Sequence, residues 1–224
     1  MREVVLDTET TGLSPKNGDR LVEIGCLELK NHVPTGEVFH CYINPERDVP
    51  AEAEAVHGLT TEFLADKPVF SEVALPFIEF VGSSPLVIHN ASFDLGFINS
   101  ELEALGKCSI PNSQAIDTLS LARSRYPGAP ASLDALCRRF SIDNSCRTKH
   151  GALLDAELLA EVYLEFQGGK QPGLELTEQM VVNTNLKIES HSVTRPPRAH
   201  CPTDDELIAH SALIKKLENP IWDR

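Results

Sequence analysis

The chain has 224 residues, of which 42% are hydrophobic, and it carries a formal net charge of −13. This length and composition suit one domain of about 150 to 200 residues with a sizeable core, followed by an extension. No apolar run approaches the roughly 20 residues that span a bilayer, and the N-terminus lacks the apolar segment of a signal peptide, which excludes membrane-spanning and exported proteins. We therefore expect a cytoplasmic protein with no membrane partner.

The cysteines and the charge narrow the class of protein further. The six cysteines form no CxxC pair and no metal-ligand spacing, which predicts reduced thiols in the core. A protein that binds nucleic acid is usually basic, so an acidic chain needs cations or a partner protein to hold a phosphate backbone. The one basic stretch, residues 138–150, either contacts such a backbone or is an ordinary solvated face.

The first third of the chain predicts three β-strands. An apolar run begins at Val4 and ends in acids, and residues 21–29 and 38–45 alternate between apolar and polar side chains. Short connections between these strands indicate an antiparallel meander. Residues 68–82 then carry apolar side chains at helical spacing, although Pro76 is expected to break or delay the first turns.

The middle of the chain alternates strands with helices, and the order of elements predicts an α/β fold with a mixed sheet. We expect a short buried strand at 85–90, a helix at 91–105, a strand running into a helix at 115–122, and helices at 132–140 and 150–166.

The last quarter of the chain predicts an extension outside the domain. The folded part is expected to end at residue 168, and residues 169–202 are polar and proline-bearing, which is typical of a flexible linker. A capping box at Thr203 and Glu206 then opens an amphipathic helix that is too short to fold alone. We therefore expect residues 203–224 to dock on a partner surface.

Asp7 and Glu9 are candidates for a metal site. Residues i and i+2 of a strand point to the same face, so the two carboxylates project together. Adjacent carboxylates repel, and burial would keep one of them protonated unless a cation such as Mg²⁺ compensates. The alternative for this pair alone is an exposed strand end whose acids face water.

Two more acids favour the metal site. Asp94 follows the predicted strand at 85–90, at the carboxyl end where open α/β sheets place their ligands, although an acid at a helix start can also be a simple dipole partner. Asp155 has only alanine, glycine and leucine neighbours three and four residues away in its predicted helix. An unpaired carboxylate there would be costly, which predicts a metal or a hydrogen-bonded polar cluster.

His150 is a candidate general base. It lies five residues before Asp155, a rotation of about 140° within a helix, so the two side chains meet only if His150 precedes the helix on a loop. An imidazole in that position can take up a proton at neutral pH. The alternative is a polar surface histidine.

Three ordered motifs resemble those of the DEDD exonuclease superfamily, in its histidine-containing branch: LDTETTGL (6–13), HNASFD (89–94) and HGALLDA (150–156). More narrowly, SLDALCRRF (132–140) and the residues around the third motif resemble the epsilon proofreading subunits of bacterial DNA polymerase III. The resemblance covers residues 1–168 and resumes at 203–222.

The resemblance implies a ribonuclease-H-like fold, a five-stranded mixed sheet flanked by helices. It also implies a 3′–5′ exonuclease that removes mispaired 3′-terminal nucleotides of DNA as 5′-monophosphates, with two Mg²⁺ or Mn²⁺ ions and His150 as the base. The implied metal ligands are Asp7, Glu9, Asp94 and Asp155.

The implied contacts with the terminal nucleotide are Asp7, Glu9 and Asp155 together with Glu52 and His57. Leu13 and Phe93 are candidates to wedge and stack the terminal bases, as apolar and aromatic side chains do on single strands, or they are plain core residues.

The resemblance also implies partners. QPGLEL (171–176) resembles a sliding-clamp-binding peptide with Gln171, Leu174 and Leu176 as anchors, although Leu176 stands where an aromatic residue is frequent. Residues 203–224 resemble the segment that docks on the polymerase alpha subunit.

Two other functions are compatible with the motifs. An RNA 3′-exonuclease of the same fold would use the same acids, but the tail with its helix argues against it. A non-catalytic adaptor could keep the fold, but the intact set of acids with His150 makes that reading weaker.

Overall fold

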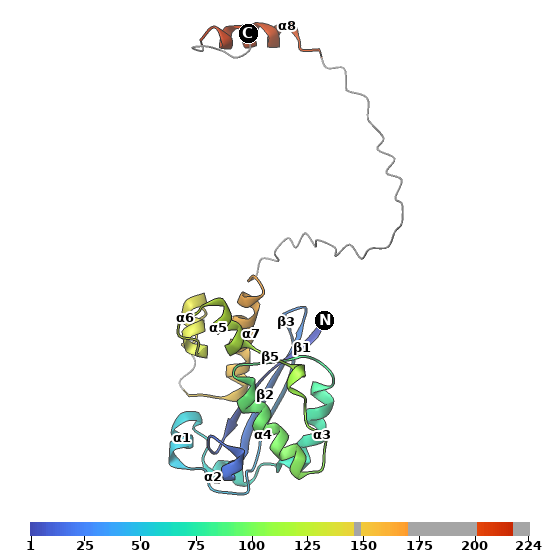
Figure 1. Cartoon of the computed structure of the whole chain (residues 1–224), viewed down its shortest axis with the longest axis vertical. Helices are drawn as coiled ribbons and strands as arrows, with labels where there is room; N and C mark the ends of the chain where they lie inside the picture. Colours follow the sequence, from blue (N-terminus) through green and yellow to red (C-terminus); the bar gives the residue numbers. More distant parts are fainter. Residues whose placement is uncertain (146–148, 170–200, 217–224) are drawn as a thin grey trace, which may run out of the picture. The chain divides into compact units, whose positions relative to one another are not determined.

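The computed structural model describes residues 1–145, 149–169 and 201–216 (Figure 1). The chain divides into two compact units, residues 1–175 and residues 176–224. The described part of the first unit is an α/β domain, and that of the second contains a single helix. None of the described helices combines the length and the apolar character that crossing a membrane requires.

The domain is built on one five-stranded mixed sheet with the strand order β3-β2-β1-β4-β5. The first three strands form the predicted antiparallel meander, and the last two run parallel to β1. The central strand is therefore β1, and its carboxyl end lies in the middle of the sheet. The strands are β1 (Arg2–Thr10), β2 (Leu21–Lys30), β3 (Val33–Tyr42), β4 (Leu86–Ile88) and β5 (Ala115–Asp117).

Helices cover both faces of the sheet, with α3 and α4 on one face and α5, α6 and α7 on the other (Figure 1). Alternation along β1 supplies both cores, because Val4 and Leu6 join the first cluster and Val5 joins the second. The helices are α3 (Phe70–Val81), α4 (Ala91–Ala104), α5 (Thr118–Arg125), α6 (Leu133–Phe140) and α7 (Ala152–Phe166). The predicted ribonuclease-H-like arrangement is confirmed.

The structure corrects the predicted elements in three places. Two short helices, α1 (Ala51–His57) and α2 (Thr61–Ala65), lie where none was predicted. The third strand begins at Val33, five residues before the predicted start. Pro76 lies inside a continuous α3, so the expected break does not occur. The missing hydrogen bond costs about 3 kcal/mol, and burial of apolar side chains on both sides of the proline offsets that cost.

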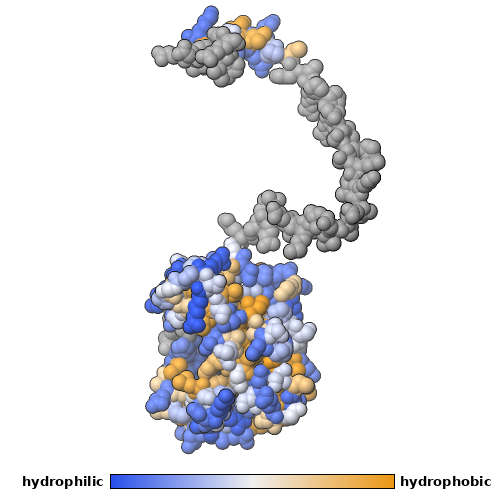
Figure 2. Space-filling view, viewed as in Figure 1, coloured by the Kyte–Doolittle hydropathy of each residue, from blue (hydrophilic) through white to orange (hydrophobic). Residues whose placement is uncertain are grey.

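The helix of the second unit, α8 (Asp204–Ile214), begins at the predicted capping box. The Thr203 hydroxyl accepts a hydrogen bond from the Glu206 N–H at 3.3 Å, and the Glu206 carboxylate accepts one from the Thr203 N–H at 2.8 Å. Apolar residues of this helix lie beside hydrophilic ones on its surface (Figure 2). Leu207, Ile208 and Leu213 are exposed. The predicted clamp anchors, residues 171, 174 and 176, lie outside the described residues.

Candidate active site

The carboxyl end of β1 presents two acids on one face, as predicted. Asp7 and Glu9 are half-buried and line the same cavity. Thr8 between them is buried and points to the opposite face, where its hydroxyl donates a hydrogen bond to Asp94 Oδ1 at 2.7 Å. The strand therefore supplies two candidate ligands directly and orients a third.

Asp94 lies in the first turn of α4, which starts at the carboxyl end of β4. The turn into the helix is sharp, because Asn90 has a left-handed backbone conformation with φ 72°, and Asp117 accepts a hydrogen bond from the Asn90 N–H at 3.0 Å. The Asp94 side chain is 3% exposed, and burial raises its pKa to about 7. A buried carboxyl with so high a pKa is the kind of group that a cation stabilises in its charged form.

Asp155 and His150 come from the start of α7. Asp155 is buried in the first turn of that helix, and His150 precedes the helix on a loop, as the spacing predicted. The two side chains meet, with 3.1 Å between His150 Nδ1 and Asp155 Oδ2. The loop is held from the other side, because the His150 N–H donates to the Val56 carbonyl at 3.2 Å.

The donor set of this site fits a hard divalent cation. Ligand atoms of Glu9, His150 and Asp155 all lie within 4.8 Å of one another. Asp7 and Asp94 line the same cavity, whose volume is about 490 Å³. Carboxylate oxygens are the ligands that Mg²⁺ and similar ions prefer. The four predicted acids and His150 are thus brought together.

A second cavity of about 560 Å³ adjoins the first, and the two share Thr8, Glu9 and Phe93 in their linings. The predicted nucleotide contacts Glu52, His57 and Leu13 line this second cavity. Leu13 is 85% exposed, so it is not a core residue, whereas Phe93 is half-buried and packs on Phe97.

His57 lines this cavity and is itself buried. Burial lowers its pKa, which favours the neutral imidazole at neutral pH. Its Nδ1 accepts a hydrogen bond from the Leu59 N–H at 3.0 Å, so the proton of the neutral ring resides on Nε2. At neutral pH His57 therefore favours a buried Nε2–H donor over a charged ring.

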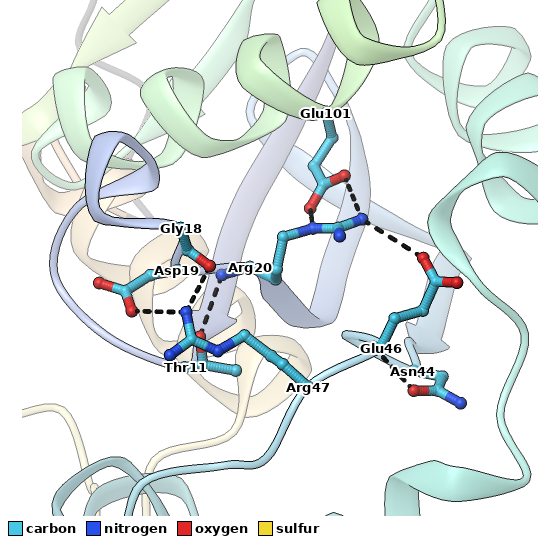
Figure 3. A network of polar contacts seen from close by, with 8 residues as sticks. All are labelled: Thr11, Gly18, Asp19, Arg20, Asn44, Glu46, Arg47 and Glu101. Atoms are coloured by element: carbon cyan, nitrogen blue, oxygen red, sulfur yellow. Dashed lines mark hydrogen bonds and ion pairs between the residues drawn. The ribbon is translucent and has the colours of Figure 1, made fainter.

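A network of polar contacts fixes the β1–β2 turn that carries Leu13 (Figure 3). Backbone and side-chain bonds join Thr11 to Arg20 at 2.9 and 3.0 Å, and the Arg20 guanidinium makes a bidentate pair with the buried Glu101 of α4. Across the turn, Arg47 binds the Asp19 carboxylate at 3.1 Å. The turn is thereby tied to two other parts of the domain, which holds it in one conformation.

Two residues at the site, Arg123 and Gly25, had no role in the sequence predictions, and His89 entered them only as part of the HNASFD motif. Arg123 of α5 lines the first cavity, one helical turn after Leu119, which also lines it. His89 lines it too and lies 2.9 Å from the Thr118 hydroxyl. Gly25 of β2 pairs with Asp7, and a side chain there would collide with the backbone at the start of α7. Among these residues, only Arg123 could have been assigned to the site from the sequence, because its i, i+4 spacing from Leu119 puts both side chains on one face of a helix.

The fold and the site define an exonuclease. The family model for exonucleases matches residues 4–163. Among solved structures, exonuclease X in complex with 5′-overhanging duplex DNA is similar with a TM-score of 0.58 at 26% identity, over 74% of this chain and 90% of that one. The nuclease domain of 3′hExo, a DEDDh family member bound to rAMP, shares the fold with a TM-score of 0.64 at 16% identity, over 75% and 92%.

Curated relatives narrow the class. DNA polymerase III subunit epsilon of Rickettsia typhi is 49% identical over 222 residues, which are 97% of each chain. The subunit epsilon of Escherichia coli strain K12 is 44% identical over 245 aligned positions, 99% of this chain and 97% of that one. This chain belongs to the family of DNA polymerase III epsilon subunits, and it is a proofreading 3′–5′ exonuclease.

Proposed function

We propose that the cavity at the end of β1 hydrolyses the 3′-terminal phosphodiester of DNA and releases mispaired nucleotides as 5′-monophosphates. One observation carries this assignment: acids from three separate elements, β1, α4 and α7, converge with His150 on one cavity. No structural need of the fold brings these groups together, because mutual repulsion of buried carboxylates is destabilising.

Asp7, Glu9, Asp94 and Asp155 would hold two Mg²⁺ or Mn²⁺ ions. When bound, such ions lower the pKa of the attacking water and stabilise the charge on the attacking and leaving oxygens. The rigid supports of the four carboxylates, a central strand and the first turns of two helices, fix the donor positions before the substrate arrives.

His150 would be the general base. The Asp155 carboxylate can only accept a hydrogen bond, so the 3.1 Å contact places the ring proton on Nδ1 and leaves Nε2 as the proton acceptor. The imidazole side chain is half-exposed, so it can deliver the proton to bulk water after each turnover.

The second cavity would bind the terminal nucleotide. Glu52 and the Nε2–H of His57 would orient its polar groups, Phe93 would stack on a base, and Leu13 would insert as a wedge behind the terminal base. The high exposure of Leu13 supports the wedge, because a large apolar side chain on a fixed turn has no partner in the core.

The decisive experiment is Mg²⁺-dependent degradation of a primer with a mismatched 3′ end, using the wild type and Asp7→Ala. We expect Asp7→Ala to lose most hydrolysis with an unchanged circular-dichroism spectrum. Wild-type rates in that variant would overturn the assignment. Matched DNA and RNA oligonucleotides in the same assay distinguish a DNA proofreader from an RNA exonuclease.

We further propose that residues 203–224 dock on the polymerase alpha subunit. The relatives are named as subunits of DNA polymerase III, and α8 carries exposed Leu207, Ile208 and Leu213 on a helix of 11 residues. Such a helix is marginal by itself and gains stability when a partner covers its apolar side chains. Deleting residues 203–224 should abolish copurification with the alpha subunit and leave hydrolysis of single-stranded DNA intact.

Residues 171–176 are proposed to bind the sliding clamp. This rests on the sequence alone, with Gln171, Leu174 and Leu176 as anchors. Changing Gln171 and Leu176 to alanine should weaken association with the clamp, and an unchanged binding isotherm would refute the motif.

A further inference from the structure

The lining of the 490 Å³ cavity includes one arginine beside the catalytic acids. Arg123 projects from α5 into a lining that otherwise contains, as charged or titratable groups, only histidines and acids. The chain has a net charge of −13 and the substrate is a polyanion, so a positive charge in this cavity would attract a substrate that most of the protein repels.

Arg123 differs from the other arginines near the site. Arg20 is paired with Glu101 and Arg47 with Asp19, and Arg125 donates to the Phe166 carbonyl at 2.6 Å. Arg123 is exposed, and within the described residues its guanidinium has no hydrogen bond or ion pair. Its five N–H donors are therefore available to a ligand.

The two cavities define the path of a bound strand. If the terminal nucleotide occupies the cavity with Glu52 and His57, the scissile phosphate lies where the cavities meet, at Glu9. The rest of the strand then continues into the 490 Å³ cavity, past Phe93, toward Arg123. The phosphodiester upstream of the scissile bond is the anion that this path brings to α5.

We propose that Arg123 binds the phosphodiester on the 5′ side of the penultimate nucleotide, one linkage upstream of the scissile bond, and holds the primer strand in the cleft. This inference rests on the proposed function of the cavity. Arginine suits the task because its planar guanidinium can make two parallel hydrogen bonds to one phosphate. The contact would offset locally the repulsion between an acidic protein and DNA.

The test compares two substrates of the full-length protein in Mg²⁺. One is a single-stranded oligodeoxynucleotide, and the other is the p-nitrophenyl ester of thymidine 5′-monophosphate, which has no upstream phosphodiester. For Arg123→Ala we expect the KM of the oligonucleotide to rise about tenfold, with kcat within about twofold. The slope of log(kcat/KM) against log[salt] should become shallower by about 0.7. The KM of the ester should not change.

Two further variants separate a phosphate contact from a general loss of charge. Arg123→Lys keeps the charge, so its KM for the oligonucleotide should lie between those of the wild type and Arg123→Ala. Lys30→Ala removes one positive charge from the exposed end of β2, outside the cavity lining, and should behave as the wild type.

An equal rise in KM for both substrates, or an unchanged KM for the oligonucleotide, in Arg123→Ala would overturn the role of Arg123. Inactivity of the wild type on both substrates would instead overturn the proposed function of the cavity itself.

Discussion

The close approach of β2 to α7 makes Gly25→Ala a sensitive probe of the site. Gly25 is buried and lies opposite Asp7, and an added Cβ would sit 2.5 Å from the Ala152 carbonyl oxygen and closer still to the Leu153 nitrogen. These are backbone atoms of the first turn of α7, so no side-chain rotation relieves the collision. Ordinary van der Waals contact begins near 3.4 Å and the Leu153 nitrogen would lie at 2.3 Å, so the start of α7 must move by about 1.1 Å.

That displacement has a calculable consequence. Asp155 and His150 move with α7, whereas Asp7 and Glu9 stay on β1. A misplacement of about 1 Å costs on the order of a hundredfold in rate, and overpacking of this kind costs about 1 to 3 kcal/mol of stability. We therefore expect Gly25→Ala to fold, with a kcat about a hundredfold below the wild type and a KM that changes little.

The assay is single-turnover hydrolysis of a 5′-labelled oligonucleotide at saturating Mg²⁺, with a thermal melt of each protein. Gly96→Ala is the matched control, because a Cβ at that helical position meets no heavy atom within 4 Å, and its activity should equal that of the wild type. Wild-type kcat in Gly25→Ala with an unchanged melt would refute the reasoning.

Three other predictions follow from buried polar groups. The pKa of Asp94 is raised from 3.8 to about 7, so its contribution to stability is full below pH 4 and is lost as the pH rises through 7. Urea unfolding of metal-free protein should therefore show stability falling over that range, and Asp94→Asn should flatten the profile. Tyr163→Phe removes the donor 2.8 Å from the buried Glu3 carboxylate, so the free energy of unfolding should drop by about 1 to 3 kcal/mol with kcat unchanged; an unaltered urea midpoint would contradict this. Glu101→Gln weakens the bidentate pair with Arg20 that helps to fix the turn carrying Leu13. Removal of paired 3′ ends needs that fixed turn, so it should slow more than removal of mismatched ends. Equal slowing of the two reactions would count against the wedge role of Leu13.

The acids of the site were predictable because strand alternation and helix spacing are local rules. The i, i+2 pair at Asp7 and Glu9 needs only the strand, and the apolar neighbours of Asp155 need only the helix. His150 could be placed on a loop because five residues of helix would have turned it away. The structure agrees with each of these predictions.

Other features depend on distant contacts and left little trace in the sequence. Helices α1 and α2 have seven and five residues, too few for a periodic pattern. The continuity of α3 through Pro76 depends on the core that its apolar side chains join. Arg123 lines the cavity only because the fold places α5 near the carboxyl end of β1. Gly25 is required only because the backbone at the start of α7 lies against β2.

The central position of β1 also determines how the enzyme should lose activity on heating. This strand pairs with β2 along its whole length and with β4 at Val4 and Val5, and its Leu6 is fully buried. Amide hydrogens of such a strand exchange with solvent mainly through global opening of the domain. Asp7 and Glu9 are therefore not exposed to partial unfolding, and heat inactivation should coincide with loss of the whole fold.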